Sequence, residues 1–386
     1  MPPVTRRLVI ITEIISPYRI PLFNALARHP DIHLHVVFLA ETDPGLRQWQ
    51  VYKDEIQFSY QVLSSYRKRI RGHNALINRG VGRALSVAKP DAILCGGYNY
   101  LASWQALRWS RKRGVPFLLW SESNLQDMRA GSAFVEFLKR QFLHRCSGFV
   151  VPGRSALEYL RAHGIEDRDI FTAVNAVDND RFSQAAVRAR EKAIRLRSEL
   201  SLPARYFLFV GRLVREKGIF ELLAAYATLE EELREQIGLV FVGDGPSRRP
   251  LETEAASVAR GVIKFVGFSH QEQLPAYYAL AEMLVLPTYT DTWGLVVNEA
   301  MACGLPVILS EAAGCAADLV THNWNGRIVP PRNVAALASA IRDLASRPDE
   351  CAAMSLNSRT RIAAYSPPEW SNGVARGLEA VRMKRG

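Results

Sequence analysis

Short runs of apolar residues alternate along the chain with longer stretches in which apolar residues recur at helical spacing. Ten of the runs are nearly continuous and rich in β-branched residues, which predicts parallel strands covered on both faces. They form two series: 8–11, 34–39, 92–95, 117–120 and 149–151, then 207–210, 239–242, 263–266, 283–286 and 307–309. Segments between them, such as 21–28 and 220–229, have helical spacing. This repeated strand–helix–strand pattern predicts two doubly wound α/β sheets.

The two series of strands are separated by residues 178–200, which lack a strand pattern and are rich in Arg, Ala, Glu and Lys. We therefore place a domain boundary near residue 182, so that residues 1–181 and 182–366 each form a Rossmann-like domain. The sequence Ser-Pro-Pro at 366–368 predicts a break before a final helix, 367–386. Two such domains are expected to face each other across a cleft at the carboxyl ends of their strands, where ligands bind.

The composition is that of a globular chain: 386 residues, 48% hydrophobic and 23% charged. No apolar run reaches the ~18 residues of a membrane-spanning helix. The first apolar run carries Glu13 and lacks a small-residue cleavage site, so it is interpreted as a strand and not as a signal peptide. The five cysteines are scattered without a C-x-x-C pair, which favours reduced thiols and a cytoplasmic location.

The net charge of +11 is concentrated in one part of the chain. Residues 61–145 contain fifteen Lys or Arg and four Asp or Glu, a local net charge of +11. Such a patch indicates an anionic partner, namely phospholipid headgroups, a lipid pyrophosphate or nucleic acid, although a solvated face of Arg-rich helices has the same composition. The basic, amphipathic segment 134–145 is expected to lie on a membrane or to pack on the first sheet.

The most informative segment follows the run 283–286. Residues 291–308 read DTWGLVVNEAMACGLPVI, in which Gly294 opens a predicted helix that ends near Cys303, before Gly304 and Pro306. The free N–H groups at the start of this helix are expected to point at an anion, aided by the helix dipole. These groups belong to Gly294, Leu295 and Val296.

Two carboxylates accompany this helix start. Glu299 lies just over one turn into the helix, where a carboxylate can accept the two hydroxyl protons of a ribose diol. Asp291 precedes the helix and is placed to take hydroxyls of a sugar attached to the diphosphate. The alternative is an ordinary strand–loop–helix unit with solvated acids.

A basic motif precedes the acidic one by some 80 residues. Residues 211–218 read GRLVREKG, between the strand run 207–210 and a predicted helix. Gly211 permits close backbone approach, while Arg212 and Lys217 supply two cations for a diphosphate. Basic loops of this kind are common, but the pairing of both motifs in one domain predicts a nucleotide-diphosphate site.

G-R-x-x-x-x-K-G followed by an acid-x7-Glu motif that ends E-A-M-A-C-G-L-P-V-I resembles the family-four retaining glycosyltransferases of GT-B architecture. Within that family the likeness is to members acting on bacterial surface polysaccharides or lipid-linked glycans. Further matches are VGDGP at 242–246, VGF at 266–268, and VNAVD at 174–178 with Phe182. The resemblance implies that the second domain binds the nucleotide sugar and that the final helix crosses back to the first domain.

The resemblance also implies a set of donor-binding positions, with the base contacted by backbone groups of residues 262–268. The catalytic set is Arg212, Lys217, Asp291 and Glu299; the donor-binding set is Gly211, Gly243, Gly245, Val266, Gly267, Phe268, Gly294, Leu295 and Val296. The first domain is expected to bind the acceptor. Its candidate residues near strand ends are Arg19, Tyr98 and Glu122.

Three positions depart from the family pattern. Asp291 stands where a glutamate is usual, so the contact with the donor sugar is shortened by one methylene or made through water. Glu122 falls at about the place of a histidine found in many relatives. The first loop reads SPYR at 16–19 in place of a Gly-Gly pair, and its Arg19 is expected to meet a phosphate or to lie on the surface.

The prediction is a retaining glycosyltransferase that moves a sugar from a UDP- or GDP-sugar to a hydroxyl of a glycan or lipid-linked acceptor, without a metal or another cofactor. It is expected in the cytoplasm, at an anionic membrane surface as a peripheral protein, with no nucleic acid partner. The D-x-D sequences at 167–169 and 178–180 are not expected to hold a metal, because they flank the domain junction. The alternatives are a nucleotide-sugar epimerase of the same architecture or a basic nucleic-acid-binding protein.

Overall fold

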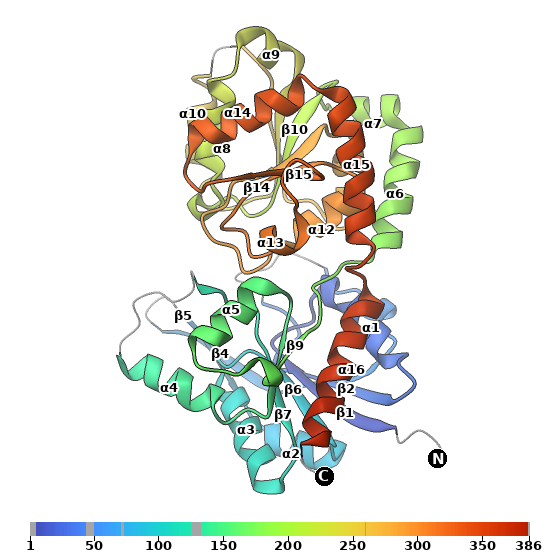
Figure 1. Cartoon of the computed structure of the whole chain (residues 1–386), viewed down its shortest axis with the longest axis vertical. Helices are drawn as coiled ribbons and strands as arrows, with labels where there is room; N and C mark the ends of the chain where they lie inside the picture. The colour runs from blue at the N-terminus through green and yellow to red at the C-terminus, as the bar shows by residue number, and fades with distance from the viewer. Residues whose placement is uncertain (1–4, 44–49, 71–72, 126–132, 259, 385–386) are drawn as a thin grey trace. The chain divides into compact units, whose positions relative to one another are not determined.

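The computed structural model describes residues 5–43, 50–70, 73–125, 133–258 and 260–384. The chain divides into two compact units, the first Met1–Val177 with Pro367–Gly386 and the second Asp178–Ser366 (Figure 1). The boundary expected after residue 181 falls inside helix α6 (Asn179–Glu191), whose first turn is capped by the Asp178 carboxylate. The unit boundary therefore lies four residues earlier, because the capped helix belongs as a whole to the second unit.

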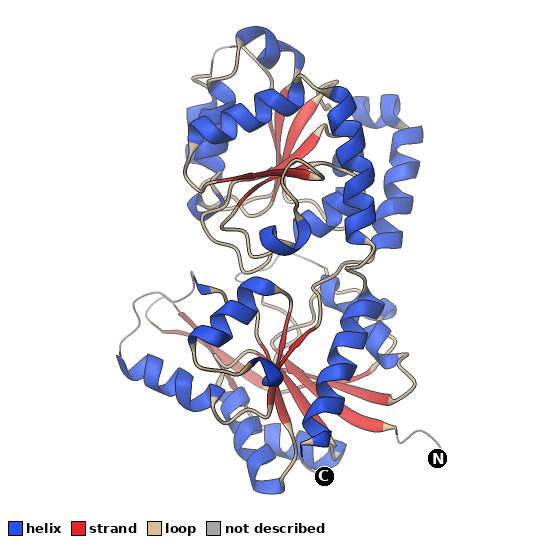
Figure 2. Ribbon diagram, in the orientation of Figure 1, coloured by secondary structure: helices blue, strands red, loops and turns tan. Residues whose placement is uncertain are grey.

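The first unit contains a seven-stranded parallel sheet in the order β3-β2-β1-β6-β7-β8-β9 (Figure 2). Its strands are β1 (Arg6–Thr12), β2 (Ile32–Phe38), β3 (Ser59–Val62), β6 (Ala92–Gly96), β7 (Phe117–Trp120), β8 (Gly148–Val151) and β9 (Ile170–Thr172). A separate antiparallel hairpin pairs β4 (Ser65–Ile70) with β5 (His73–Asn78). The strand order reverses between β1 and β6, which is the arrangement of a doubly wound sheet.

Helices cover both faces of this sheet. They are α1 (Ile20–Ala27), α2 (Val81–Ala88), α3 (Leu101–Arg113), α4 (Ala133–Leu143), α5 (Arg154–Ala162) and α16 (Pro367–Met383), with short 3-10 turns at Pro17–Arg19, Lys53–Glu55 and Asp167–Asp169. Alternate residues of β1 point to opposite faces, so Val9 and Ile11 join one buried cluster while Leu8 and Ile10 join the other. Both faces therefore exclude water, as a parallel sheet requires.

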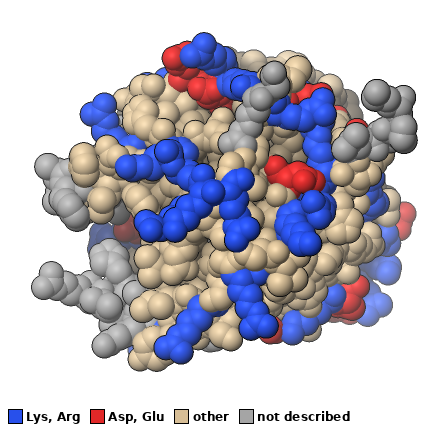
Figure 3. All heavy atoms as spheres, turned by 90° about the horizontal axis from the view of Figure 1, so that it is seen from below, with Lys and Arg blue, Asp and Glu red and all other residues tan. Residues whose placement is uncertain are grey.

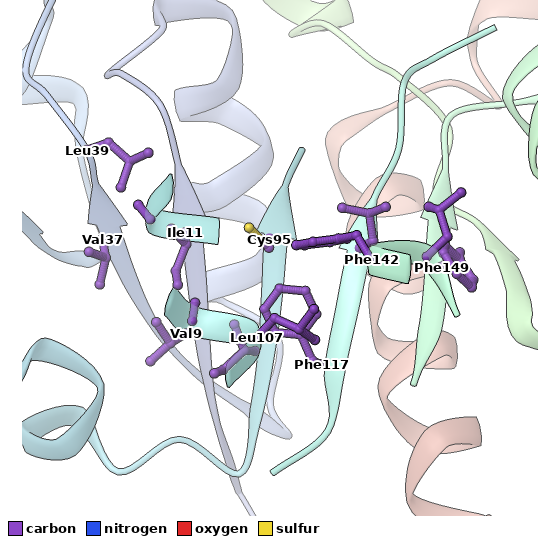
Figure 4. Packing of buried hydrophobic residues seen from close by; sticks show 14 of the residues in the cluster. Val9, Ile11, Val37, Leu39, Cys95, Leu107, Phe117, Phe142 and Phe149 are labelled. Atoms are coloured by element: carbon purple, nitrogen blue, oxygen red, sulfur yellow. The ribbon is translucent and has the colours of Figure 1, made fainter. Parts of the chain in front are cut away.

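The two clusters have different partners. In the first, Phe142 of α4 packs against Phe117 and lies beside Cys95 and Leu107 of the neighbouring elements (Figure 4). In the second, Trp370 of α16 packs against Phe23 of α1 and Trp120 of β7. The final helix thus completes the core of the first unit, as the resemblance implied.

The second unit contains a six-stranded parallel sheet in the order β12-β11-β10-β13-β14-β15. Its strands are β10 (Tyr206–Val210), β11 (Gly238–Val242), β12 (Ile263–Gly267), β13 (Met283–Leu286), β14 (Val307–Ser310) and β15 (Gly326–Val329). Its helices are α6, α7 (Ala193–Glu199), α8 (Ile219–Ala227), α9 (Glu231–Gln236), α10 (Arg248–Ala255), α11 (Leu274–Leu280), α12 (Leu295–Ala302), α13 (Ala316–Leu319), α14 (Val334–Ala345) and α15 (Pro348–Ile362), with a 3-10 turn at Arg215–Lys217. The strand order again reverses between neighbours, here β10 and β13.

All ten strands predicted from the apolar runs are present, and each unit is a doubly wound sheet as expected. The strands that the pattern missed are β3, β9 and β15 in the sheets and the hairpin β4–β5. These strands are short or polar, and β3, β9 and β15 are sheet edges. β3 and β9 also carry exposed or half-buried residues, so they lack the continuous apolar signal of a strand covered on both faces. No helix in the described ranges is long and apolar enough to cross a membrane.

Candidate functional site

The predicted donor residues of the second unit gather at the carboxyl ends of β10 and β13, on the two sides of the point where the strand order reverses. At such a point the connections leave towards opposite faces of the sheet, and a crevice opens at the strand ends. Residues 211–218 follow β10, and residues 287–294 follow β13. The topology therefore brings together two motifs that lie some 80 residues apart in the sequence.

The two loops are fastened to each other through the backbone. The carbonyl oxygen of Glu216 accepts hydrogen bonds from the Tyr289 N–H at 2.8 Å and from the Thr288 hydroxyl at 2.9 Å. Gly218 has a φ of +68°, and a Cβ atom there would lie 2.0 Å from the carbonyl oxygen of Pro287. Only glycine fits this contact, so the position of the basic loop depends on Gly218.

We expect Gly218→Ala to lower the free energy of unfolding by about 2–4 kcal/mol, the sum of the left-handed backbone and the overlap with Pro287. Urea denaturation of the wild type and the variant measures this difference. Gly164→Ala is the matched control, since Gly164 also has a positive φ of +79° but nothing lies within 4 Å of its Cβ position. Equal losses in the two variants would contradict the close contact as the cause.

A third loop, after β11, is built against the first. The Gly211 N–H donates to the Val242 carbonyl at 3.0 Å, and the Leu213 N–H donates to the Asp244 carbonyl at 2.9 Å. A Cβ atom at Gly243 would lie 1.9 Å from the carbonyl oxygen of Gly211, so this glycine is required by backbone proximity. The VGDGP turn thus supports the start of the basic loop.

Lys217 and Asp291 form an ion pair between the loops after β10 and β13, and both side chains are largely buried. The sequence placed them in separate roles, the lysine on phosphate and the aspartate on the donor sugar. The structure adds that the aspartate directly neutralises the lysine. Arg212, by contrast, is exposed and forms no ion pair with any carboxylate of the described ranges.

The N-terminus of α12 opens at the same edge. Gly294 is its N-cap residue, with a φ of +97°. Within the described ranges, the N–H groups of Leu295 and Val296 have no hydrogen-bond acceptor, whereas the Val297 N–H donates to the Gly294 carbonyl at 2.9 Å. Free amides at a helix start attract an anion, and both backbone and dipole contribute.

Glu299 of α12 is only 7% exposed, and its Oε2 atom accepts a hydrogen bond from the Tyr278 hydroxyl at 2.7 Å. Burial raises the pKa of Glu299 to about 7, although the Tyr278 hydrogen bond pulls that pKa down. Tyr278 lies on α11, packed beside α12, and the sequence gave no indication of this role. One carboxylate oxygen is therefore already engaged, which leaves Oε1 for a further donor.

The end of β12 supplies the remaining predicted donor positions. Val266 is partly buried and Gly267 is buried, and Gly267 forms an isolated bridge with Gly243. Phe268 is 41% exposed, with its ring edge-on to His270 at 5.2 Å. Gly245 donates its N–H to the Asp244 carboxylate at 2.7 Å. Gly243 and Gly245 lie against the loop after β10, and Gly267 adjoins them through its bridge with Gly243.

In the first unit, two of the predicted acceptor residues form an ion pair. Arg19 donates to the Glu122 carboxylate at 3.1 Å and to the hydroxyl of Thr12, the last residue of β1, at 2.9 Å. Its guanidinium also lies 4.5 Å from the Trp120 ring centroid. Burial disfavours its charged form, but Glu122, Tyr18 and Glu13 together outweigh this and raise the pKa of Arg19. The Asn175 amide donates to the other Glu122 oxygen at 3.3 Å.

This cluster shows where Arg19 of the SPYR loop lies. Arg19 is neither a surface residue nor free, because it is held between β1, β7 and the residues after them. Neither Thr12 nor Trp120 was predicted as a member, although a polar residue at the end of a central strand is a recognisable signal. Tyr98, the third predicted residue, is hydrogen-bonded to the Tyr159 hydroxyl at 2.9 Å. Burial raises its pKa.

The first aspartate of each of the two D-x-D sequences has a structural partner. Asp178 caps α6 by accepting the Arg181 N–H at 3.0 Å. Asp167 is paired with Arg161 at 2.6 Å on the surface. Among the described residues, no group of three or more His, Cys, Asp and Glu is arranged to hold a metal ion.

Comparison with known proteins identifies the family that this chain resembles. Residues 191–361 match the family described as glycosyl transferases group 1. The GDP-mannose-dependent alpha-(1-6)-phosphatidylinositol monomannoside mannosyltransferase of Mycobacterium tuberculosis is 30% identical over 296 residues, which cover 74% of this chain and 70% of that protein. TuaC of Bacillus subtilis, a glycosyltransferase assigned to teichuronic acid biosynthesis, is 36% identical over 151 residues, 39% of this chain and 36% of TuaC.

Among the curated relatives that head this comparison, the chain spans from about a third to just over half of their length. Among solved structures, Anabaena HepE in complex with UDP-glucose superposes with a TM-score of 0.74 at 17% identity, over 97% of this chain and 100% of HepE. At that identity the likeness concerns the fold, and it confirms the expected GT-B architecture of two Rossmann-like units.

Proposed function

Since the chain belongs to the group 1 glycosyltransferases, we propose that it transfers a sugar from a nucleotide-diphosphate sugar to an acceptor hydroxyl. The observation that carries this proposal is the site at the β10–β13 edge. It combines a lysine paired with an acid, free amides at a helix start and a buried glutamate within one unit. Cations and amides suit a diphosphate, and carboxylates suit the hydroxyls of two sugars.

Each residue of the site has a proposed role. Lys217, the exposed Arg212 and the Leu295 and Val296 amides bind the diphosphate. The Oε1 atom of Glu299 accepts a hydrogen bond from a ribose hydroxyl, while Oε2 keeps its hydrogen bond from the Tyr278 hydroxyl. Two further contacts complete the donor complex. Asp291 accepts a hydroxyl of the donor sugar, and the backbone around Gly243, Gly245 and 266–268 contacts the base.

The proposed transfer retains configuration at the anomeric carbon. The bond between that carbon and the diphosphate oxygen breaks, and the acceptor oxygen bonds to the same face. The departing phosphate oxygen takes the acceptor proton, so no separate base is needed. The protein's contribution is to hold both partners and to stabilise the charge that develops on the diphosphate.

The donor is proposed to be a UDP- or GDP-sugar, used without a metal or another cofactor. The relatives support both bases, since the mycobacterial enzyme is named for GDP-mannose and HepE was solved with UDP-glucose. The charge that a metal provides in other enzymes is assigned here to Lys217, Arg212 and the α12 dipole.

The acceptor is proposed to be a hydroxyl of a glycan or a lipid-linked glycan, bound by the first unit. Glu122, held by Arg19 and Asn175, offers a fixed carboxylate at the carboxyl end of β7. Tyr98 offers an aromatic face and a hydroxyl after β6. A cytoplasmic location at an anionic membrane surface belongs to the same proposal, because lipid-linked acceptors are presented there.

Thermal unfolding with UDP, GDP, ADP and their sugar conjugates tests the nucleotide site. A ligand at 100 times its Kd adds about 2.7 kcal/mol, which raises Tm by several degrees. We expect a shift with the conjugates of one base and its loss in Glu299→Ala. No shift with any nucleotide would contradict the proposal, and conversion of the donor to an isomer without acceptor would favour an epimerase.

A further inference from the structure

A hollow lies at the amino ends of β1, β6 and β7, the edge of the first sheet opposite to the acceptor candidates. Its volume is about 460 Å³. Its floor is apolar, formed by Leu8, Pro90, Val115, Pro116, Leu378 and Val381. Arg7 and Arg382 stand at its rim, and the one carboxylate in its lining, Asp91, pairs with Arg7 at 3.5 Å. None of the residues given a role in glycosyl transfer lies here.

Basic side chains belong to the segments that line this hollow or directly adjoin them. They come from the start of β1 and from the last turns of α2, α3 and α16, or the residues just after them: Arg7, Lys89, Arg111, Lys112, Arg113 and Arg382. All six are exposed. Within the described ranges, only Arg7 forms an ion pair with a carboxylate. Figure 3 shows the chain from this end, where Lys and Arg side chains cover much of the middle of the face.

Helix dipoles account for only part of this charge. The carboxyl ends of α2, α3 and α16 reach this face, and each contributes roughly half a negative charge. Together with Asp91 they leave an excess of about three and a half positive charges. Unpaired cations gathered on one face create a positive potential that attracts anionic surfaces.

Apolar side chains are exposed on the same elements. Val87 near the end of α2 is 76% exposed, and Met383 at the end of α16 is 67% exposed. An apolar hollow within a basic rim, with exposed aliphatic groups beside it, matches the boundary between the headgroups and acyl chains of an anionic bilayer. A single-stranded polynucleotide is typically held by stacking on aromatic groups, and Trp109 of α3 is instead covered by Arg113 at 4.9 Å.

We propose that this basic face, defined by the six residues above, docks the first unit on an anionic lipid bilayer. The headgroup phosphates meet the basic rim, and Val87 and Met383 reach the acyl boundary. This contact does not depend on the transfer chemistry, since it lies at the sheet edge opposite to the acceptor candidates.

Helix α4 is the competing membrane contact. It buries Phe142 and Leu143 in the core and exposes Phe137 by 56% and Leu138 by 36%. Its Lys139, however, is paired with Glu136 at 3.2 Å and lies over the Tyr159 ring. The helix therefore offers fewer uncompensated cations than the basic face, and the test must separate the two.

The test is co-sedimentation of the full chain with phosphatidylglycerol vesicles and with phosphatidylcholine vesicles, at low and at physiological salt. We expect binding to phosphatidylglycerol alone, weakened by salt. Each basic side chain near such a surface contributes roughly a fivefold gain in partitioning. Lys112→Glu/Arg382→Glu is therefore expected to lose about 25-fold or more.

The matched control is Arg188→Glu/Lys192→Glu, which makes the same change of charge on exposed residues of the second unit. It is expected to lose less than threefold, since the net charge alone is altered. Equal losses in both double variants, or a comparable loss in Phe137→Ser/Leu138→Ser, would overturn the proposal. So would retention of polynucleotides on filters without any binding to vesicles. The nucleotide-induced shift in Tm must persist in the Lys112→Glu/Arg382→Glu variant, since that shift shows that the variant is folded. A loss of vesicle binding with an intact shift in Tm is thereby distinguished from a failure of the proposed function.

Discussion

Lys217→Ala is expected to lower kcat/KM by about 10²–10³-fold, the loss seen when one preorganised group is removed from a developing charge. In the proposed transfer the bond to the anomeric carbon breaks, and negative charge builds on the diphosphate. Lys217 is held at that place by the ion pair with Asp291 and by the backbone bonds of its loop. Because the charge is larger in the transition state than in the bound donor, most of the loss should be in kcat.

The ion pair between Lys217 and Asp291 leads to a second expectation, for the double variant. In the unliganded protein Asp291 neutralises Lys217, so removal of Asp291 alone frees the cation but removes the proposed contact with the donor sugar. The two residues share one network, and their effects on kcat/KM should not add. We therefore expect the double variant Lys217→Ala/Asp291→Asn to be less impaired than the product of the two single losses.

Steady-state kinetics with the donor identified by the thermal shifts measures these losses. Lys192→Ala is the matched control, because Lys192 is an exposed lysine of the same unit at the end of α6. Its kcat/KM should stay within twofold of the wild type, since salt screens the charge of a solvent-exposed side chain. An unchanged kcat/KM in Lys217→Ala would remove the phosphate role from this residue.

Much of the donor site follows from the sequence because its parts are local. The strand β10, the glycines of its loop and the start of α12 are each encoded within a few residues. The rule for doubly wound sheets then places the loops after β10 and β13 at one edge, whatever their separation along the chain. Local signals and one topological rule are therefore enough to place Lys217 and Asp291 at the same edge of the sheet, where they form an ion pair.

What the sequence did not show depends on packing between elements. The Tyr278 hydroxyl meets Glu299 because α11 packs beside α12, and no spacing in the sequence encodes that contact. In the same way, the sequence left two alternatives for Arg19, a contact with a phosphate or a place on the surface. Its actual partner, Glu122, is 103 residues away on another strand end. Long-range contacts of single side chains are fixed by the tertiary fold, so a pattern predicts that a polar group lies there but not what it binds.

Glu299 provides the second large effect, a dependence of donor binding on pH. The pKa of Glu299 is raised to about 7 in the unliganded protein, chiefly by burial. A ribose hydroxyl donates to the ionised carboxylate, so the affinity should be constant well above pH 7 and fall as the pH drops through that value. Below it, each pH unit is expected to cost about tenfold in affinity, until the pKa of the bound state is reached.

Calorimetric titration with a nucleotide sugar across this range measures the effect. The sugar conjugate is required because the terminal phosphate of a free diphosphate itself titrates at about pH 6. Tyr278→Phe removes the hydrogen bond that lowers the pKa of Glu299, so the midpoint should move to higher pH. Glu299→Gln should bind more weakly at high pH and show no midpoint near 7.

These two variants separate a role in binding from a role in structure. The raised pKa also means that the folded state holds the Glu299 proton more tightly than the unfolded chain does, where the value is near 4.5. Stability without ligand should therefore decline as the pH rises from about 4.5 to 7, and Glu299→Gln should abolish that decline. If the midpoint of donor binding persists in Glu299→Gln, another group titrates. If Glu299→Gln abolishes the decline of stability with pH but leaves the midpoint of donor binding unchanged, Glu299 is a buried structural acid. The ribose must then be held by another residue.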